Sequence, residues 1–165
     1  MLRPATPDDL PLLDELARSE PVASVLAPGA ADALAAALER DGEELLVVEH
    51  EGRTVGAALM VVRSPHSRIV TLESVMLDPA VRRTGLGVAT VRALTRRAFE
   101  EGFHRVEAEV YGFNEAGRRT FVAAGFTHEG TRRAAYDRHG AWQDGIVFGL
   151  VGDAPPRGTA ASSRS

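Results

Sequence analysis

Two kinds of hydrophobic periodicity alternate along the chain. Apolar residues recur every three or four positions in some stretches, which is the spacing of an amphipathic helix. Elsewhere they form short runs bounded by Gly, Pro, Asn or Asp, which is typical of strands. The predicted helices are one that begins after Thr6, then residues 30–40, 88–101 and 114–124. The predicted strands are the first few residues, then 45–49, 55–62, 69–77, 106–110, 126–133 and 146–151.

The order of these elements predicts an α+β fold. The strands at 45–49, 55–62 and 69–77 follow one another across short turns, so they should form an antiparallel meander. The run 69–77 is apolar on both faces, which indicates a central strand covered on both sides. We expect a mixed, mostly antiparallel sheet of about six or seven strands flanked by about four helices. Residues 20–29, with two prolines, are predicted to be a loop.

The length and composition of the chain indicate a single globular domain. We expect residues 1–151 to form it, and residues 152–165, rich in Gly, Pro, Ser and Ala, to be a disordered tail. The net charge of −4 argues against a nucleic-acid partner. The absence of Cys excludes disulfides and thiolate chemistry. No apolar run is long enough for a membrane span and no apolar segment follows the first residues, so we expect a cytoplasmic protein.

The segment between the predicted strand 69–77 and the helix 88–101 reads Val-Arg-Arg-Thr-Gly-Leu-Gly. Gly85 and Gly87 lack a Cβ, so their backbone can approach a ligand closely. The first N–H groups of the helix have no partner within it and carry the positive end of the helix dipole. Arg82 and Arg83 add forked donors suited to phosphate oxygens. This turn therefore predicts a site for a phosphate-bearing ligand, most simply a pyrophosphate.

The turn matches neither the phosphate loop of nucleoside triphosphatases nor the dinucleotide fingerprint G-x-G-x-x-G. Its Arg82-x-x-Gly85-x-Gly87 spacing resembles the acetyl-coenzyme A (acetyl-CoA) signature of the GNAT acetyltransferase superfamily. A second match is Asn114, followed eleven residues later by the pair Gly125-Phe126. The stretches 126–133 and 140–144 resemble the RimJ/RimL-type ribosomal-protein acetyltransferases and the phosphinothricin-type acetyltransferases.

The resemblance implies a GNAT fold in which the strand 69–77 splays away from the strand 106–110 in a V shape. Acetyl-CoA would lie in the gap as a co-substrate, with its pantetheine arm along the backbone of the first strand and its pyrophosphate on the turn. Phe121 would pack near the thiol end. The cofactor-binding residues expected in this way are Val75, Met76, Leu77, Arg82, Arg83, Thr84, Gly85, Leu86, Gly87, Val88, Asn114 and Phe121.

The implied reaction is acyl transfer from the thioester to a primary amine, which needs a base because the amine must lose a proton. Glu73 is the candidate, since it lies within an apolar strand where an unpaired carboxylate readily takes up a proton. The alternative is that Glu73 simply pairs with an Arg. A free N–H near residues 75–77 would stabilise the oxyanion. Many relatives have a Tyr at the position of Phe121, and Tyr111 and Tyr136 are weak substitutes for that missing acid.

Other polar residues stay open between structural and functional roles. The five histidines lack metal-ligand spacing, so we expect no metal, although His66 or His139 could line a substrate entrance. Glu107 and Glu109 should share a solvated or substrate-facing strand face. The acceptor is expected to be a small amine or amino-acid-like compound. A peptide N-terminus, and a non-catalytic acyl-CoA sensor, are the alternatives, and a homodimer is possible for the family.

Overall fold

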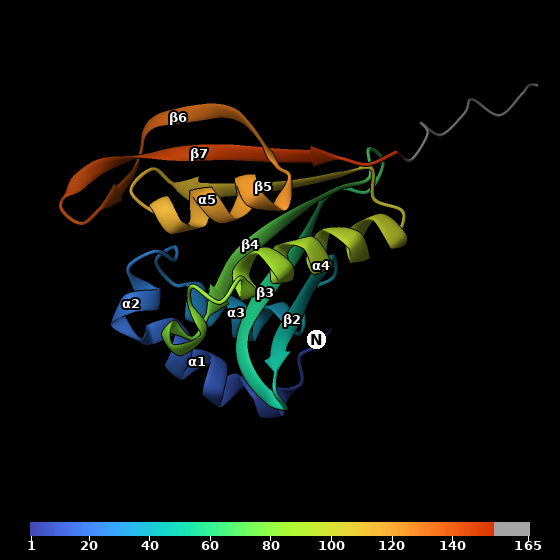
Figure 1. Cartoon of the computed structure of the whole chain (residues 1–165), viewed down its shortest axis with the longest axis vertical. Coiled ribbons are helices and arrows are strands. Elements are labelled where there is room, and N and C mark those ends of the chain that lie inside the picture. The colour runs from blue at the N-terminus through green and yellow to red at the C-terminus, as the bar shows by residue number, and fades with distance from the viewer. Residues whose placement is uncertain (154–165) are drawn as a thin grey trace, which may run out of the picture.

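The computed structural model describes residues 1–153, in which a seven-stranded sheet carries helices on both faces (Figure 1). From residue 154 onward, the tail predicted to be disordered lies outside the described residues. The elements in chain order are β1 Leu2–Pro4, η1 Pro7–Asp9, α1 Leu10–Arg18, α2 Glu20–Ala23, α3 Ala30–Ala37, β2 Glu43–His50, β3 Arg53–Ser64, β4 Ile69–Leu77, η2 Pro79–Val81, α4 Leu86–Glu100, β5 Arg105–Tyr111, α5 Glu115–Ala124, β6 Thr127–Arg138 and β7 Ala141–Val151.

The strands lie in the order β1-β2-β3-β4-β5-β7-β6, so the predicted mixed, mostly antiparallel sheet is confirmed. Strands β4 and β5 form the parallel pair, and every other neighbouring pair is antiparallel. Helix α4 connects β4 to β5, as a parallel crossover requires. Strand β7 returns between β5 and β6, which leaves β6 at the edge of the sheet.

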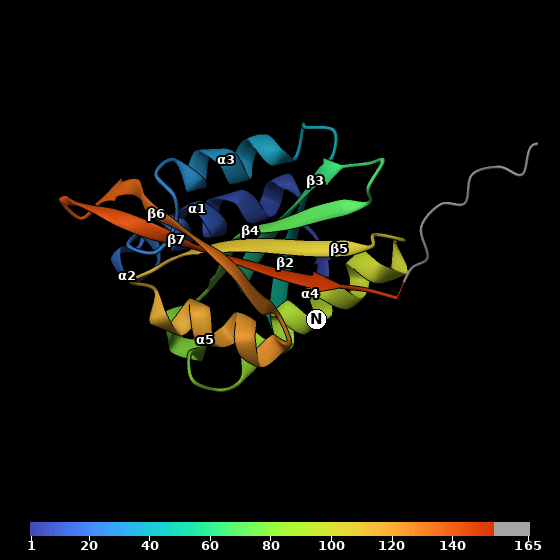
Figure 2. The ribbon, with the colours of Figure 1, turned by 90° about the horizontal axis from the view of Figure 1, so that it is seen from above.

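Two hydrophobic layers hold the sheet, one on each face, and Figure 2 shows α1 and α3 on the side opposite α4 and α5. Alternation along β3 divides its side chains between the two layers. Ala58 and Met60 pack with α4 and α5, whereas Leu59 and Val61 pack with α1 to α3. The first layer continues across β5 to Phe148 of β7. The second layer ends at β4. On this side of the sheet, α1 to α3 therefore do not cover β5.

The structure corrects two predictions about loops. Residues 20–29 contain a short helix, α2, which begins with Pro21 in its first turn, a position where proline favours helix formation. The hairpin of β6 and β7 is much longer than the predicted strands 126–133 and 146–151, and its loop is only His139 and Gly140. Both loop residues have positive φ, 55° and 74°, as a two-residue hairpin turn with the sheet's twist requires.

Within the described part of the chain, no helix combines the length and the apolar character needed to cross a membrane.

Candidate functional site

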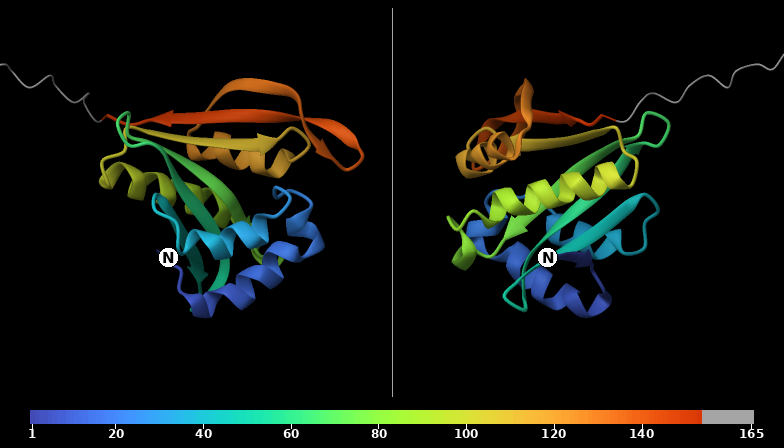
Figure 3. Two further views of the ribbon diagram at one scale, coloured as in Figure 1. Left: turned by 180° about the vertical axis from the view of Figure 1, so that it is seen from behind. Right: turned by 45° about the vertical axis from the view of Figure 1, so that its right-hand side comes forward.

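Strands β4 and β5 are paired at one end only. Their register runs from Ile69 opposite Arg105 to Leu72 opposite Ala108 and then stops, although both strands continue. Beyond that point the two strands diverge, which is plain in the two views of Figure 3. The sheet therefore contains an internal edge, where backbone groups of β4 are free to pair with a ligand as a strand would.

A β-bulge lies where the strands part. Leu59 of β3 faces Glu73, while Ala57 faces Met76, so β4 holds one residue more than its partner here. Ser74 lies in this bulge and has a φ of 48°, in the left-handed region. After the bulge, Asp78 donates its N–H to the Val55 carbonyl of β3 at 2.7 Å. Strand alternation then turns the N–H groups of Val75 and Leu77 toward the gap, where they can hold a carbonyl or an oxyanion.

The turn before α4 has the geometry of an anion site. Gly85 is its N-cap and has a φ of 85°, a conformation that suits glycine. The first backbone bond of the helix runs from Ala89 to Gly85 at 3.1 Å, so the N–H groups of Gly87 and Val88 lack a backbone partner in the described part of the chain. The Thr84 hydroxyl donates to the Val81 carbonyl at 2.8 Å and braces the turn. Arg82 is partly engaged, because it donates to the Pro21 carbonyl at 2.9 Å.

A cleft of about 770 Å³ joins these features. It lies between β4 and β5 and extends from the start of α4 to the β6–β7 hairpin. Of the predicted cofactor-binding residues, Val75, Leu77, Gly87, Asn114 and Phe121 line it. Met76 does not, because its side chain is buried in the layer under α1 to α3. Residues 82–86 sit in the turn at the start of α4, and Val88 packs against the other layer.

Glu73 lines the cleft but does not have the apolar, unpaired setting that the sequence suggested. Its carboxylate is bound by the guanidinium of Arg63 from β3, and its side chain is 36% exposed. Glu73 lies on the face of the sheet where α1 to α3 do not cover β5. The sequence predicted that β4 would be covered on both sides, but at Glu73 this face is open to a ligand. Pairing with an Arg was the alternative reading of the sequence, and the geometry keeps Glu73 within the cleft in either case.

A second carboxylate in the cleft, that of Glu109, is held by more than one side chain. Glu109 of β5 accepts the hydroxyl of Tyr136 at 2.7 Å and a guanidinium N–H of Arg132 at 3.1 Å. Burial, aided by the hydrogen bond to Glu109, raises the pKa of Tyr136 to about 12, so the phenol stays a donor at neutral pH. The carboxylate rests against Gly145, where an added Cβ would lie 2.0 Å from it.

Sequence reasoning missed this arrangement of Glu109, Tyr136 and Arg132. It placed Glu109 on a solvated or substrate-facing face and considered Tyr136 only as a weak candidate acid. The two residues are 27 positions apart and meet only because β6 folds back across β7. Tyr111 also lines the cleft, stacks on Phe113 at 5.2 Å and meets Tyr136 edge-on at 5.2 Å. Burial raises the pKa of Tyr111 as well.

The opposite wall of the cleft comes from α5. Asn114 caps this helix, its side-chain oxygen accepting the Gly117 N–H at 3.0 Å, and it lines the cleft. Phe121 is almost fully buried and packs on Phe126 and Phe148. It lines the cleft without offering a hydroxyl. Thr120 lies beside Gly87, and an added Cβ there would sit 3.6 Å from it, so α4 and α5 are in close contact at the cleft.

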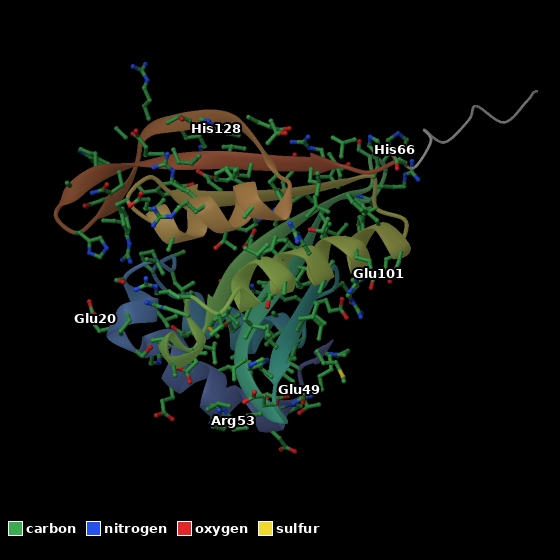
Figure 4. The ribbon with its side chains drawn as sticks, in the orientation of Figure 1. Glu20, Glu49, Arg53, His66, Glu101 and His128 are labelled. Carbon is green, nitrogen blue, oxygen red and sulfur yellow. The ribbon has the colours of Figure 1, made fainter. Side chains whose placement is uncertain are left out.

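Two of the histidines are placed far apart, His66 on the turn after β3 and His128 on the edge strand β6 (Figure 4). His66 lies at the end of the sheet away from the splay and is not among the residues that line the cleft. His139 contacts the Ser24 carbonyl in the loop after α2, and the next residues of that loop, Val25 to Ala27, line the cleft. That His66 or His139 lines a substrate entrance stays a prediction. Among residues 1–153, no group of three or more His, Asp or Glu is arranged to hold a metal ion.

Trp142 and Asp144, two positions apart on β7, fit a structural role in the hairpin. Trp142 is 71% exposed at the outer end of the hairpin. Asp144 accepts the N–H of Ala134 at 2.8 Å and so holds the irregular part of β6. Of the arginines after Asn114, Arg118 donates to the Gly112 carbonyl at 3.1 Å and Arg119 pairs with Glu115 at 2.8 Å on the surface.

Comparisons with known proteins agree with this geometry. The profile of the acetyltransferase (GNAT) family matches residues 10–126. A spermidine N-acetyltransferase from Vibrio cholerae, solved with CoA and spermine, superposes with a TM-score of 0.81 at 16% identity, over 92% of this chain and 94% of that one. A ribosomal-protein-alanine N-acetyltransferase from Brucella melitensis gives 0.75 at 24% identity, over 92% and 99%. A protein described as a phosphinothricin N-acetyltransferase gives 0.78 at 18% identity, over 92% and 97%. These likenesses establish the fold and leave the acceptor open.

Proposed function

The chain belongs to the acetyltransferase (GNAT) family as an acetyl-CoA-dependent N-acetyltransferase, and we propose that its acceptor is a small, amino-acid-like primary amine. The observation that carries the proposal is the lining of the cleft, which combines carboxylates with guanidinium groups. Glu73 of β4 and Glu109 of β5 lie on one face of the sheet, with Arg63 and Arg132 beside them. A compound with both an ammonium and an acidic group finds a partner for each there. We take residues 1–151 as the acetyltransferase domain.

The size of the cleft supports a small acceptor. Sites for small molecules enclose about 300–1,000 Å³, and this cleft measures about 770 Å³. Part of that space would hold the pantetheine arm, along the N–H groups of Val75 and Leu77. The remainder is bounded by the loop residues Val25 to Ala27 on one side and Tyr136 on the other. A peptide would need a groove that continues past these walls.

Acetyl-CoA fits the residues that are present. The turn at Thr84 to Val88 offers free N–H groups to the pyrophosphate, with Arg83 beside them. The free edge of β4 suits an extended arm with amide groups, which would add to the sheet as a strand does. Asn114 faces the same arm from α5.

The chemistry assigned to these residues is direct attack of the amine on the thioester carbon. Glu73 takes the proton that the ammonium must lose, either directly or through a water. The N–H of Val75 or Leu77 stabilises the oxyanion that forms on the acetyl oxygen. The nitrogen, now bonded to the thioester carbon, gives its second proton to water as the C–S bond breaks, the amide forms, and the thiolate leaves. Since Phe121 has no hydroxyl, water protonates that thiolate, and the pKa of about 8.5 that is typical of a free thiol makes it an acceptable leaving group.

A thiol-release assay with a panel of acceptors tests the proposal. Amino-acid-like amines should be acetylated with a kcat/KM at least about tenfold above that of peptides that begin with the same residue. The ribosomal-protein type of activity would instead give the higher value for peptides. Tight binding of acetyl-CoA in calorimetry without turnover of any amine would indicate the non-catalytic acyl-CoA sensor. Assays at equal concentrations of free α-amine make the two acceptor classes comparable.

A further inference from the structure

The tip of the β6–β7 hairpin holds the loop that follows α2. Arg138, the last residue of β6, donates from one guanidinium nitrogen to three carbonyls, those of Ala23, Ser24 and Leu26, at 3.0, 3.2 and 3.0 Å. More than a hundred residues of sequence separate the two segments. His139, the next residue, places its Nε2 atom 2.9 Å from the Ser24 carbonyl. Four contacts thus converge on a segment of four residues.

The Arg138 guanidinium meets several separate hydrogen-bonding and packing requirements in this contact, which indicates that the contact is specific. The carbonyls at the end of a helix have no partner within it, and Arg138 supplies one to those that end α2. Its guanidinium lies over the ring of Tyr111, 5.6 Å from the centroid. Its Nε atom is buried with no partner among the described residues, so the charge depends on the three carbonyls. The His139 ring meets Phe113 edge-on at 5.0 Å.

The held loop is also a wall of the cleft. Val25, Leu26 and Ala27 line it from one side, and Tyr136, two residues before Arg138, lines it from the other. Arg138 and His139 therefore join the two walls outside the reacting centre. If these contacts were released, the loop after α2 and the hairpin would be free to separate, and the cleft would become a groove open at that end.

We infer that Arg138 and His139 form a latch that keeps the acceptor end of the cleft closed and so selects small amines over peptide N-termini. The inference rests on the proposed function for its choice of favoured acceptor. Arg138 acts here as a positioning residue, because it works through the loop at Ser24 to Ala27 and does not touch the acceptor. The contribution to specificity comes from excluding an extended chain, which a closed wall does without any attractive contact to the small amine.

Hydrogen exchange of the intact chain without substrate tests the latch itself. Arg138→Met keeps a long apolar stem and removes the donors, and His139→Ala is a milder variant on an exposed residue. Both should speed the exchange of amides at residues 24–27 by about tenfold or more, Arg138→Met the more strongly. Arg133→Met is the matched control, since Arg133 is exposed on the same strand. It should leave the exchange unchanged.

Steady-state kinetics then test selection. In Arg138→Met, the KM of the small amine should rise by about tenfold with kcat little changed, and the ratio of peptide to small-amine kcat/KM should rise by at least as much. Arg138→Lys, which keeps a cationic donor, should recover part of the loss. Acetyl-CoA affinity should stay at the wild-type value, because the cofactor edge is untouched.

Unchanged exchange at residues 24–27 in both Arg138→Met and His139→Ala would overturn the latch. Faster exchange with an unaltered acceptor ratio would overturn its role in selection. A wild-type enzyme that prefers peptides would instead overturn the proposed acceptor. In that case the exchange result still decides whether the latch exists, so the two failures are distinguishable.

Discussion

Leu72 of β4 and Ala108 of β5 are the last residues at which these two parallel strands are paired. Beyond them β5 stays paired to β7 as far as Tyr111, and β4 stays paired to β3 as far as Leu77. Each strand is therefore anchored on its outer side and free on its inner side. The sheet thus has an internal gap although both strands keep their outer hydrogen-bonded partners. The residues that border the gap can be substituted one at a time.

Replacing Gly85 with Ala should weaken acetyl-CoA binding by about tenfold or more. Gly85 has a φ of 85°, which a side chain tolerates poorly, and its N-cap position fixes the N–H groups that face the pyrophosphate. Titration calorimetry with acetyl-CoA measures the effect.

Gly102→Ala provides the control. Gly102 has a φ of 88°, and an added Cβ meets no atom within 4 Å there, as at Gly85. Both variants should lose similar stability in urea, about 1 kcal/mol, but only Gly85→Ala should lose the cofactor. Equal affinities in the two variants would show that the turn does not hold the pyrophosphate.

Glu73→Gln and Glu109→Gln should separate a base from an anchor. Loss of a general base lowers kcat by about 10²- to 10⁴-fold, and we expect this of Glu73→Gln. Glu109→Gln should mainly raise the KM of the amine, because its carboxylate is fixed by Tyr136 and Arg132 and is suited to hold an ammonium. Initial-rate kinetics across pH measure both.

Glu107→Gln serves as the matched control for these two variants. Glu107 lines the same cleft from β5, but it lies opposite Thr71 where β4 and β5 are still paired, and its carboxylate accepts from Arg105 at 2.6 Å. Its replacement should change neither constant by more than a few-fold. A wild-type kcat in Glu73→Gln at every pH would remove Glu73 from the mechanism and make Glu109 the carboxylate to examine.

The two tyrosines should both resist ionisation in the folded protein. Burial raises the pKa of Tyr111, and burial with the bond to Glu109 raises that of Tyr136 to about 12. Since the folded-state values lie above the unfolded value of about 10, their contribution to stability is complete below pH 10 and is lost as the pH rises toward 12. Ultraviolet absorbance of phenolate should stay low at pH 10 in the native protein and rise in urea. Tyr136→Phe should remove one of the two phenolate ionisations, whereas ionisation of both tyrosines near pH 10 in the native, unsubstituted protein would contradict the assignment.

Asp9→Asn should destabilise the fold at neutral pH and have little effect in acid. The carboxylate accepts two guanidinium N–H groups of Arg3 at 2.8 Å and the Thr6 N–H at 2.8 Å. The guanidinium holds the pKa of Asp9 well below its usual value. Its stabilising effect is therefore present above the unfolded pKa of about 4 and is lost as the pH falls through the folded value. Urea unfolding at pH 7 should show a loss of about 1 to 2 kcal/mol, shrinking below pH 4. A difference that is the same at pH 7 and pH 3 would contradict this linkage.

The sequence predicted the elements whose signals are local. The run 69–77 has apolar residues at six of its nine positions and on both faces, and it matches β4 residue for residue. The turn with Gly85 and Gly87 carries its own backbone requirements, so its place before a helix could be read from the glycines. The edge strand β6 was predicted too short, because its last residues, 134–138, are exposed or half-buried and show no regular hydrophobic alternation.

The parts of the site that depend on pairing between distant strands could not be predicted. Glu109 meets Tyr136 only through the insertion of β7 between β5 and β6. The setting of Glu73 depends on Arg63 of β3 and on the fact that α1 to α3 do not extend over β5 on that face of the sheet, neither of which a single strand pattern contains. The contacts of Arg138 span more than a hundred residues and involve carbonyls, which every residue has.

The extra residue at Ser74 has a consequence for the two sides of the sheet. In a regular strand, positions three apart lie on opposite sides, yet Glu73 and Met76 both belong to the side of α1 to α3. The alternation of β4 side chains between the two sides of the sheet is therefore shifted by one residue at Ser74. Residues before Ser74 and residues after it consequently follow two different alternations, which is how Glu73 can line the cleft while Met76, three positions later, packs under α1 to α3.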